Sequence, residues 1–416
     1  MKVGSAQIDI TPPLAIPMGG YWGRKGGAAE IGDALYAQAV VFQSGTRRCA
    51  LVSLDLVSIS AETVGQMRTR ISARTDLAPN SVMVCASHTH SGPLTLAYRG
   101  MGSVDEGYVD RVISAVVESV AQACAVCEEA RLYYARPPVQ IGQNRRSPHG
   151  PTVGHAHVVW CEGTQGTIAT LFQYACHPVV LGADNLKISG DFVGEAARLI
   201  ERESKGTAHF FNGACGDINP RQTNADDSAV RSLGGELASA VLEARSEAQR
   251  LSDGQVSWHL HTVDLPLRPL KSLRKQSVIL ALKLLGRATL KRRDRGAVNA
   301  ARARFRWVCD ARSEQGNHAL TFSIQGIVVG PLVFMGFEGE LFARYQLEIE
   351  EAHPEVVVCG LANGCIGYVP TADEYERGGY EVDEAHKVYP GTRGVGPESE
   401  DIIRAATEDA LTRLSD

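Results

Sequence analysis

Apolar runs typical of buried strands alternate with helical patterns through the first third of the chain. The run RCALVSLDLV at 48–57 and the run VMVCA directly before Ser87 are rich in β-branched and small apolar residues, which predicts buried strands. Ser60 is predicted to cap a helix that ends at about Arg74, and a second helical pattern covers 106–129. The order strand, helix, strand, helix predicts the α/β class.

The remaining two thirds of the chain continue this mixture. Asp191 is predicted to cap the helix that follows it. Further apolar runs predict strands at 131–135, 155–161, 167–175, 208–212, 256–265, 321–329, 332–337 and 356–362. Amphipathic spacing predicts helices at 233–247 and 399–414. We therefore expect mixed β-sheets layered with helices, and no long linker or internal repeat divides residues 1–416.

Composition excludes several classes of protein. A net charge of −5 over 416 residues favours neither a nucleic-acid binder nor a disordered acidic chain. No apolar run approaches the length that spans a bilayer. The start, MKVGSAQIDITPP, lacks the apolar core of a signal peptide, and ten cysteines in a chain of this length are not a disulfide scaffold. We expect a cytoplasmic location.

A basic segment stands apart from this mild overall charge. Residues 271–306 hold twelve Lys or Arg residues and one acid, Asp294, so the rest of the chain is strongly negative. The spacing at 271–290 is helical. One interpretation is a basic amphipathic segment that touches a membrane surface or an anionic substrate. The other, which we favour, is a solvated pair of helices packed on the body.

The stretch SHTHSGP at 87–93 carries the first candidate chemistry. His88 and His90 lie two residues apart at the exit of a buried strand, and side chains at that spacing in an extended chain point the same way. Both imidazoles are therefore expected to face one pocket. Such a pair is typical of two zinc ligands, or of one ligand and one proton carrier. A pair of structural histidines at a strand end is the alternative.

Polar residues follow other predicted strands in the same way. His177 lies before Pro178, which holds it in an extended conformation. The stretch GACGDINPR at 213–221 offers Asp217 and Asn219 beside glycines that let a ligand approach closely. In the loop at 142–150, Arg145 or Arg146 could bind an oxyanion or carboxylate through a forked guanidinium, although solvent-facing arginines are the ordinary alternative.

Three of these candidates form the composition of a hydrolytic zinc site. Glu340 follows Gly339 at the predicted start of a helix, where a carboxylate is either a cap or an inward ligand. His88, His177 and Glu340 each lie just past a buried strand, and α/β sheets bind ligands beyond the carboxyl ends of their strands. Two histidines and a carboxylate with an open position suit hydrolytic zinc. The pattern alone does not establish that the three converge.

Eight short motifs in order identify a resemblance. They are DITPP near the N-terminus, SHTHSGP at 87–93, NR at 144–145, HP at 177–178, SGD at 189–191, GD.NP at 216–220, GE at 339–340, and GYVPT…EY…YE from 367 to 381. In this order, and over nearly the whole length, the chain resembles the neutral/alkaline ceramidase family. The resemblance implies a zinc-dependent amidase that attacks an N-acyl bond with zinc-bound hydroxide.

The resemblance also assigns roles to residues. His90 becomes a proton carrier, and Arg145 and Tyr380 become groups that bind and polarise the scissile carbonyl, with Asp217 and Asn219 near the substrate. The implied zinc ligands are His88, His177, Glu340 and Tyr368. The adjacent Arg146 leaves the arginine assignment open.

Three departures from the family pattern shape the expected substrate. Asn219 replaces a serine, and we expect neither a signal peptide nor a C-terminal immunoglobulin-like domain. A soluble N-acyl amide is therefore expected in preference to ceramide. A small-molecule or lipid amide is thus the expected partner, and the oligomeric state stays open. The alternatives are a zinc enzyme of the same fold acting on another soluble amide, ester or lactam in a biosynthetic pathway, and a non-catalytic membrane-surface binding module.

Overall fold

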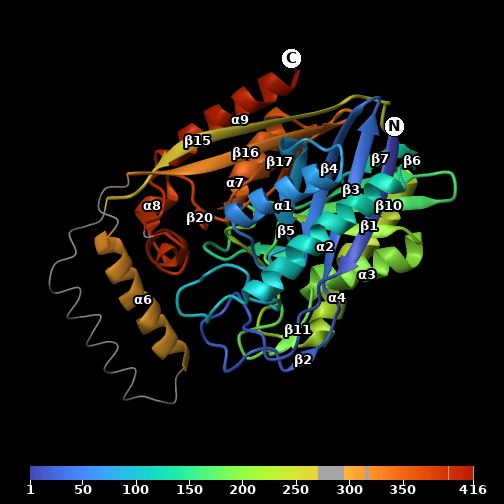
Figure 1. Cartoon of the computed structure of the whole chain (residues 1–416). Coiled ribbons are helices and arrows are strands. Elements are labelled where there is room, and N and C mark those ends of the chain that lie inside the picture. The colour runs from blue at the N-terminus through green and yellow to red at the C-terminus, as the bar shows by residue number, and fades with distance from the viewer. Residues whose placement is uncertain (270–294, 314–317, 392, 416) are drawn as a thin grey trace.

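A computed structural model describes residues 1–269, 295–313, 318–391 and 393–415, and it confirms the predicted mixed α/β class (Figure 1). The first sheet has the strand order β5-β4-β3-β1-β6. Its strands are β1 (Lys2–Asp9), β3 (Tyr36–Ser44), β4 (Arg47–Leu54), β5 (Val82–Ala86) and β6 (Glu128–Glu129). Only β4 and β5 are parallel to each other, and the other pairs are antiparallel.

Two helices cover one face of this sheet. They are α1 (Ala61–Arg74) and α2 (Glu106–Ala125). Ser60 caps α1 as predicted, since its hydroxyl accepts a hydrogen bond from the backbone N–H of Thr63 at 3.0 Å. The second helix ends before the predicted residue 129, because Glu128 and Glu129 form the edge strand β6, which pairs with β1.

The second sheet has the order β12-β10-β9-β7-β14. Its strands are β7 (Arg131–Ala135), β9 (His157–Glu162), β10 (Thr167–Tyr174), β12 (Thr207–Asn212) and β14 (Gln249–Arg250). The helices α3 (Asp191–Ser204) and α4 (Asp227–Glu243) cover it. Asp191 is not the predicted cap. It is the first helical residue, with a left-handed φ of 57°, and its buried carboxylate accepts backbone N–H groups of Leu181 and Phe192.

The third sheet, β15-β16-β17-β19, is built from the C-terminal half of the chain. Its strands are β15 (Val256–Pro266), β16 (Ala319–Val329), β17 (Leu332–Phe337) and β19 (Val356–Cys359). The helices α7 (Ala343–Ala352) and α9 (Ser399–Ser415) pack against it. Both predicted C-terminal strands before Gly339 and the closing helix are confirmed.

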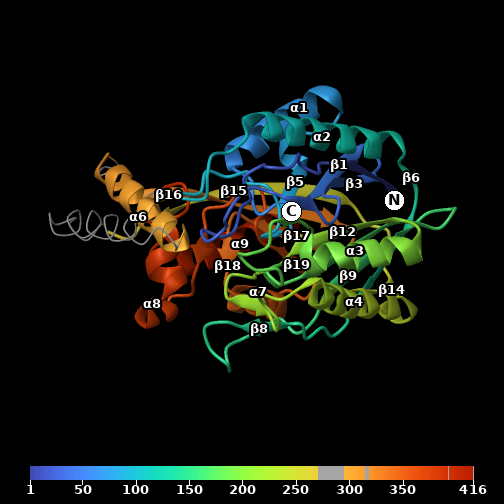
Figure 2. The same cartoon turned by 90° about the horizontal axis from the view of Figure 1, so that it is seen from below.

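The sheets pack on one another and the helices lie outside. Val40 and Phe42 of β3 point into a shared core with Leu171 of the second sheet and Phe334 of the third. Alternate residues of β3, such as Val41, face α1 and α2. Figure 2 shows α1 and α2 on one side of the sheets and α3 and α4 on the opposite side. The ends of β5, β10 and β17 are followed by the candidate histidines and Glu340.

Three two-stranded ladders organise the loops at this end. They pair β2 (Glu30–Ile31) with β11 (Lys187–Ile188), β8 (Gly142–Asn144) with β13 (Ile218–Pro220), and β18 (Glu340–Leu341) with β20 (Tyr368–Val369). Short ladders of this kind fix loop backbones through hydrogen bonds without a hydrophobic face of their own. They therefore set the positions of residues that follow the main strands.

The basic segment is described only at its C-terminal end. The predicted helical stretch 271–290 lies outside the described residues, whereas 295–306 belongs to α6 (Arg295–Ser313). That helix lies beside the C-terminal turns that contain α8 (Glu374–Arg377) and the π-helical turn Tyr380–Glu384 (Figure 1). Within the described part of the chain, no helix has both the length and the apolar character needed to cross a membrane.

Candidate metal centre and active site

His88 enters the site through a turn and not through strand alternation. β5 ends at Ala86, and His88 has a left-handed φ of 70°, so the predicted extended spacing of the two histidines is wrong. The backbone N–H of His88 donates to Leu56 at 2.9 Å, which holds this uncommon conformation. The turn still brings the rings together, because Nε2 of His90 lies 3.3 Å from Nε2 of His88.

The backbone fixes the tautomers of His88 and His177. Nδ1 of His88 lies 2.5 Å from the carbonyl of Val57, and Nδ1 of His177 lies 2.7 Å from the carbonyl of Cys215. A carbonyl only accepts hydrogen bonds, so each Nδ1 carries the proton. The lone pair of each neutral ring is then on Nε2, as in histidines that ligate metal ions.

Glu340 lies between these two lone pairs. Its Oε2 is 3.1 Å from Nε2 of His177 and 3.4 Å from Nε2 of His88, and the side chain is completely buried. Glu340 is not at the start of a helix as predicted. It belongs to β18, which pairs in register with Tyr368 in β20, and α7 begins only at Ala343. The pairing places the Tyr368 hydroxyl 3.4 Å from Nε2 of His177.

Burial and mutual charge set the protonation of this cluster. Burial raises the pKa of Glu340, but the neighbouring His88 and His177 outweigh it and hold this pKa well below its usual range. Burial, together with the Arg145 guanidinium, lowers the pKa of His177 to about 4. Burial and the two other imidazoles hold the pKa of His90 well below its usual range. These directions favour an ionised Glu340 carboxylate and neutral imidazoles at His90 and His177.

The donor set fits a transition metal ion of the zinc type. Zinc binds His nitrogen and carboxylate oxygen at about 2.0–2.2 Å, which in tetrahedral geometry separates neighbouring ligand atoms by roughly 3.3 Å. The observed separations of 3.1 and 3.4 Å around Oε2 of Glu340 match this value. The three imidazoles also qualify as a ligand group, since donor atoms of His88, His90 and His177 all lie within 4.8 Å of one another.

A cavity of about 310 Å³ opens above the cluster. Its lining comprises Gly20, Tyr21, Trp22, His90, Met101, Arg145, His177, Val179, Asn219, Thr223, Asn224, Tyr368 and Tyr380. Tyr380 is 44% exposed, and its ring centroid lies 6.0 Å from that of Tyr368. His90 and Tyr368 therefore face the cavity, whereas His88 and Glu340 lie beneath it.

The structure separates the two adjacent arginines. Arg145 reaches into the cavity, where its guanidinium lies 5.2 Å from the centre of the Tyr368 ring and donates to Glu381 Oε1 at 2.8 Å. Arg146 turns away and binds Glu374 at 2.7 Å. Of the two, only Arg145 is placed to contact a molecule above the metal cluster.

Asp217 and Asn219 take different positions. Asn219 lines the cavity, and its amide oxygen accepts from Nη1 of Arg145 at 3.2 Å. Asp217 is buried and does not line it. Its carboxylate accepts the Asn144 amide at 2.6 Å and the backbone N–H of Ala343 at 2.8 Å, which caps α7. Asp217 is therefore placed to hold the loop of Arg145 and not to touch a substrate.

Three further residues, Tyr389, Tyr21 and Arg24, shape the site, although no sequence motif identified them. The Tyr389 hydroxyl donates to Oε1 of Glu340, leaving Oε2 toward the histidines. The Tyr21 ring packs edge-on against His90 with centroids 5.0 Å apart, and Arg24 donates to the backbone carbonyl of His90. Nothing in the sequence of the glycine-rich loop at 15–27 links it to His90, and nothing in the sequence around Tyr389 links it to Glu340.

A second group of possible ligands lies elsewhere, on α7, on β9 and just before β9. It consists of His155, His157 and Glu350, with Nε2 of His157 at 2.9 Å from Oε1 of Glu350. The Arg136 guanidinium contacts both Glu350 and His155, and the Gln346 amide donates to Glu350 at 2.6 Å. A cation already neutralises this carboxylate, so the group is an ion-pair network that ties α7 to the second sheet.

This fold and cluster define a class of protein: a mixed α/β chain with a candidate mononuclear metal centre beneath a polar cavity. The family described as neutral/alkaline non-lysosomal ceramidase, N-terminal, matches residues 1–151. The neutral ceramidase of Pseudomonas aeruginosa is 24% identical over 306 residues, which cover 64% of this chain and 46% of that protein. The chain thus spans about half the length of this curated relative.

Solved structures extend the likeness over the whole fold. The crystal structure of neutral ceramidase from Pseudomonas aeruginosa aligns with a TM-score of 0.75 at 20% identity, covering 97% of this chain and 72% of that one. A structure described as ceramidase complexed with C2 gives the same TM-score and identity, with 73% of its chain covered. The chain is thus similar to neutral ceramidases in three respects: the family match at residues 1–151, the curated relative, and a fold shared over 97% of its length.

Proposed function

We propose that this protein is a zinc-dependent hydrolase that cleaves an amide bond of N-acyl type. One observation carries the proposal. Oε2 of Glu340 lies 3.1 and 3.4 Å from the Nε2 atoms of two histidines whose other nitrogens bind backbone carbonyls. Zinc-site histidines are oriented in this way. The match of residues 1–151 to the neutral/alkaline ceramidase family and the likeness to a neutral ceramidase support hydrolysis of an amide.

Four residues would hold the ion: His88, His177, Glu340 and Tyr368. Bound zinc would act as a Lewis acid and lower the pKa of water at the site to about 7. We assign His90 to the cavity wall and not to the metal ligands. It lies on the cavity side of the cluster, and its Nδ1 has no hydrogen-bond partner among the described residues.

The cavity walls supply the remaining chemistry. Arg145 and Tyr380 line this cavity. In the proposed reaction they would donate hydrogen bonds to the carbonyl oxygen of the substrate, where negative charge develops as water adds to the carbon. His90 accepts a proton from the attacking water and delivers it to the departing nitrogen. The carbon–nitrogen bond then breaks, and the products are a carboxylic acid and an amine.

The experiment is hydrolysis of a panel by the zinc-loaded chain. Ceramide in detergent, soluble N-acyl amines and N-acyl amino acids are each incubated with it, and released acid and amine are quantified. We expect cleavage of at least one N-acyl compound, loss of cleavage after chelation, and recovery with zinc. Cleavage that survives complete removal of metal would contradict the zinc role, and a panel left intact by the zinc-loaded chain would contradict the amidase.

The same panel tests whether the substrate is a lipid. The site cavity of about 310 Å³ lies at the lower end of the 300–1,000 Å³ range of pockets that bind drug-sized ligands. We propose a soluble N-acyl compound as the preferred substrate. A kcat/KM for ceramide above that for every soluble compound would overturn this choice while leaving the amidase intact.

A further inference from the structure

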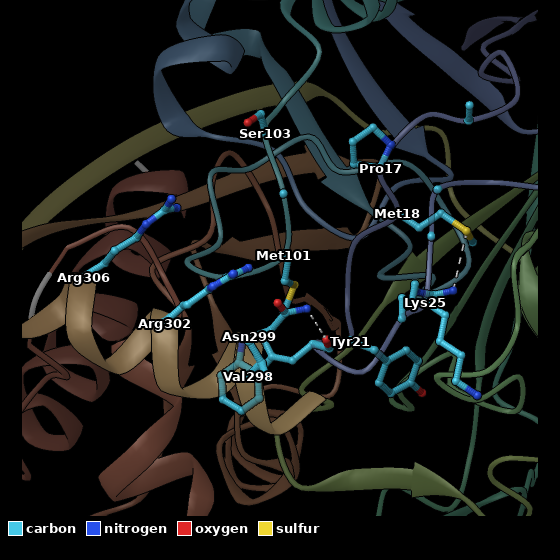
Figure 3. Close-up of a pocket in the computed structure, with 17 residues that line it drawn as sticks. Pro17, Met18, Tyr21, Lys25, Met101, Ser103, Val298, Asn299, Arg302 and Arg306 are labelled. Atoms are coloured by element: carbon cyan, nitrogen blue, oxygen red, sulfur yellow. Dashed lines mark hydrogen bonds between the residues drawn. The ribbon is translucent and has the colours of Figure 1, made fainter. Parts of the chain in front are cut away.

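A second and larger cavity adjoins the candidate active site. It measures about 800 Å³ and lies between the loop at 15–27, the loop at 100–103 and α6 (Figure 3). Tyr21, Trp22 and Met101 line both this cavity and the one above the metal cluster. A substrate whose amide lies in the site can therefore place a second group in the larger cavity, which we call the basic cavity.

The lining of the basic cavity is one-sided in charge. Arg24, Lys25, Arg302 and Arg306 line it, and none of the lining residues that the structure describes is acidic. Lys25 forms an ion pair with the exposed Asp184 at 3.1 Å. By contrast, the exposed Arg302 and Arg306 make no ion pair with any carboxylate among the residues that the structure describes.

Arg24 is a buried cation that forms no ion pair with a carboxylate among the described residues. Its side chain contacts the backbone carbonyls of His90 and Asn185, and the residue is 7% exposed. Its Nε finds no hydrogen-bond partner in the described chain. Burying a charge is costly unless an opposite charge compensates it, so an anion in the basic cavity would satisfy Arg24 as well as the two arginines of α6.

The arginines of α6 are held in place by contacts along the helix. The Asn299 amide donates to the backbone carbonyl of Trp22 at 3.0 Å, and Asp310 binds Arg99 at 2.7 Å. Gly100 packs so closely that a Cβ there would lie 2.7 Å from the carbonyl of Asn299. Figure 3 shows Arg302 and Arg306 extending from α6 on the side that faces the loop of Met101 and Ser103.

We propose that the basic cavity binds an anionic group of the substrate, so that the preferred substrate is an N-acyl compound with a carboxylate, sulfonate or phosphonate remote from its amide. The inference rests on the proposed amidase and names its substrate class. A guanidinium offers parallel donors that match the paired oxygens of such an acid. A neutral ceramide would leave the arginines of the cavity without a partner.

Matched compounds test the proposal. The acid 6-(octanoylamino)hexanoate carries its charge on the amine side, and N-octyladipamate carries it on the acyl side; the primary amide of each is the neutral control. We expect at least one acid to exceed its control about tenfold or more in kcat/KM, and the preference to shrink in salt. Sulfonate and phosphonate analogues then rank the acidic groups.

Variants localise the effect to α6. Arg302→Gln combined with Arg306→Gln should remove most of the preference, because two exposed charge contacts together are worth about tenfold. Arg304→Gln is the matched control, since Arg304 lies on the same helix but pairs with Glu384 at 2.9 Å. Equal loss in both variants, or no preference for either acid, would overturn the inference.

Calorimetric binding separates this inference from the amidase itself. Acids and controls are titrated into the wild type and both arginine variants after metal removal, so that no turnover is needed. Tighter binding of an acid that depends on Arg302 and Arg306, without hydrolysis in the zinc-loaded chain, would refute the amidase and support the anion site. Hydrolysis without an anion preference in binding or rate would refute the anion site and leave the amidase standing.

Discussion

The hydrogen bond from Tyr389 to Glu340 gives a prediction that depends on the structure alone. Tyr389 is 7% exposed, and its hydroxyl donates to Oε1 while Oε2 faces the two histidines. Tyr389→Phe removes one oxygen atom and keeps the ring that packs against Tyr98, at a centroid distance of 5.1 Å. The substitution therefore changes the support of the carboxylate with little change in packing volume.

The expected loss follows from the burial of Glu340. A hydrogen bond to a charged group is worth about 1.5–3 kcal/mol, and in a fully buried carboxylate no water replaces the lost donor. Converted at about 1.4 kcal/mol per factor of ten, this is roughly 10- to 100-fold. Outer partners of metal ligands have effects of the same size on metal affinity. We expect zinc affinity to fall by this factor.

The assay is competition for zinc between the protein and a chromophoric chelator of known affinity. Tyr98→Phe is the matched control, because Tyr98 is a buried neighbour whose hydroxyl pairs with Ser58 at 2.7 Å. It should bind zinc as the wild type does. Wild-type affinity in folded Tyr389→Phe would refute the positioning role of Tyr389. Equal weakening in both variants would show that packing, and not the bond to Glu340, controls the affinity.

Further predictions concern catalysis and stability. His90→Ala should lower kcat at least ~10²-fold on a cleaved N-acyl compound, the usual scale for loss of a proton carrier; unchanged turnover would exclude this role. Arg145→Ala should lower kcat by about 10²–10³ with folding retained, whereas Arg146→Ala, which breaks an ion pair with Glu374, should act mainly on thermal stability; the reverse pattern would exchange their roles. At Glu350, burial raises the pKa of the carboxyl group, but the hydrogen bonds with His155 and His157 outweigh burial and lower this pKa to about 2. The pKa of Glu350 is lower in the folded state than the unfolded value of about 4.3. Above a pH of about 4.3 the network should therefore stabilise the fold by roughly 2–3 kcal/mol, and this stabilisation should be lost as the pH falls toward 2. Urea unfolding at pH 7 and pH 3 should show a smaller pH dependence in Glu350→Gln, and an unchanged dependence would contradict the assignment.

Local patterns in the sequence were sufficient to locate the strands that lead into the site and the candidate residues that follow them. Apolar runs located β5, β10 and β17, and polar residues that follow such runs marked His88, His177 and Glu340. Strand ends are readable because burial and turn chemistry are local properties. The family resemblance then supplied Tyr368, which no periodic pattern singles out.

The remaining geometry depends on contacts between distant segments. The turn at His88 needs a backbone bond to Leu56, and Glu340 takes a strand conformation because it pairs with Tyr368, twenty-eight positions away. The glycines beside Asp217 suggested that it contacts the substrate, but its carboxylate instead accepts a hydrogen bond from the backbone at the N-terminus of α7. Tertiary partners of this kind override local propensity, and a single sequence does not list them.

The zinc content of three purified proteins tests the central claim most directly. Elemental analysis of the wild type, His177→Ala and His90→Ala should give about one, about zero and about one zinc per chain, because Nε2 of His177 lies 3.1 Å from Glu340 within the ligand cluster and His90 lies on the cavity wall. Full zinc in folded His177→Ala would contradict the proposed centre. Loss of zinc from His90→Ala would make the centre a three-histidine site and remove His90 as the proton carrier.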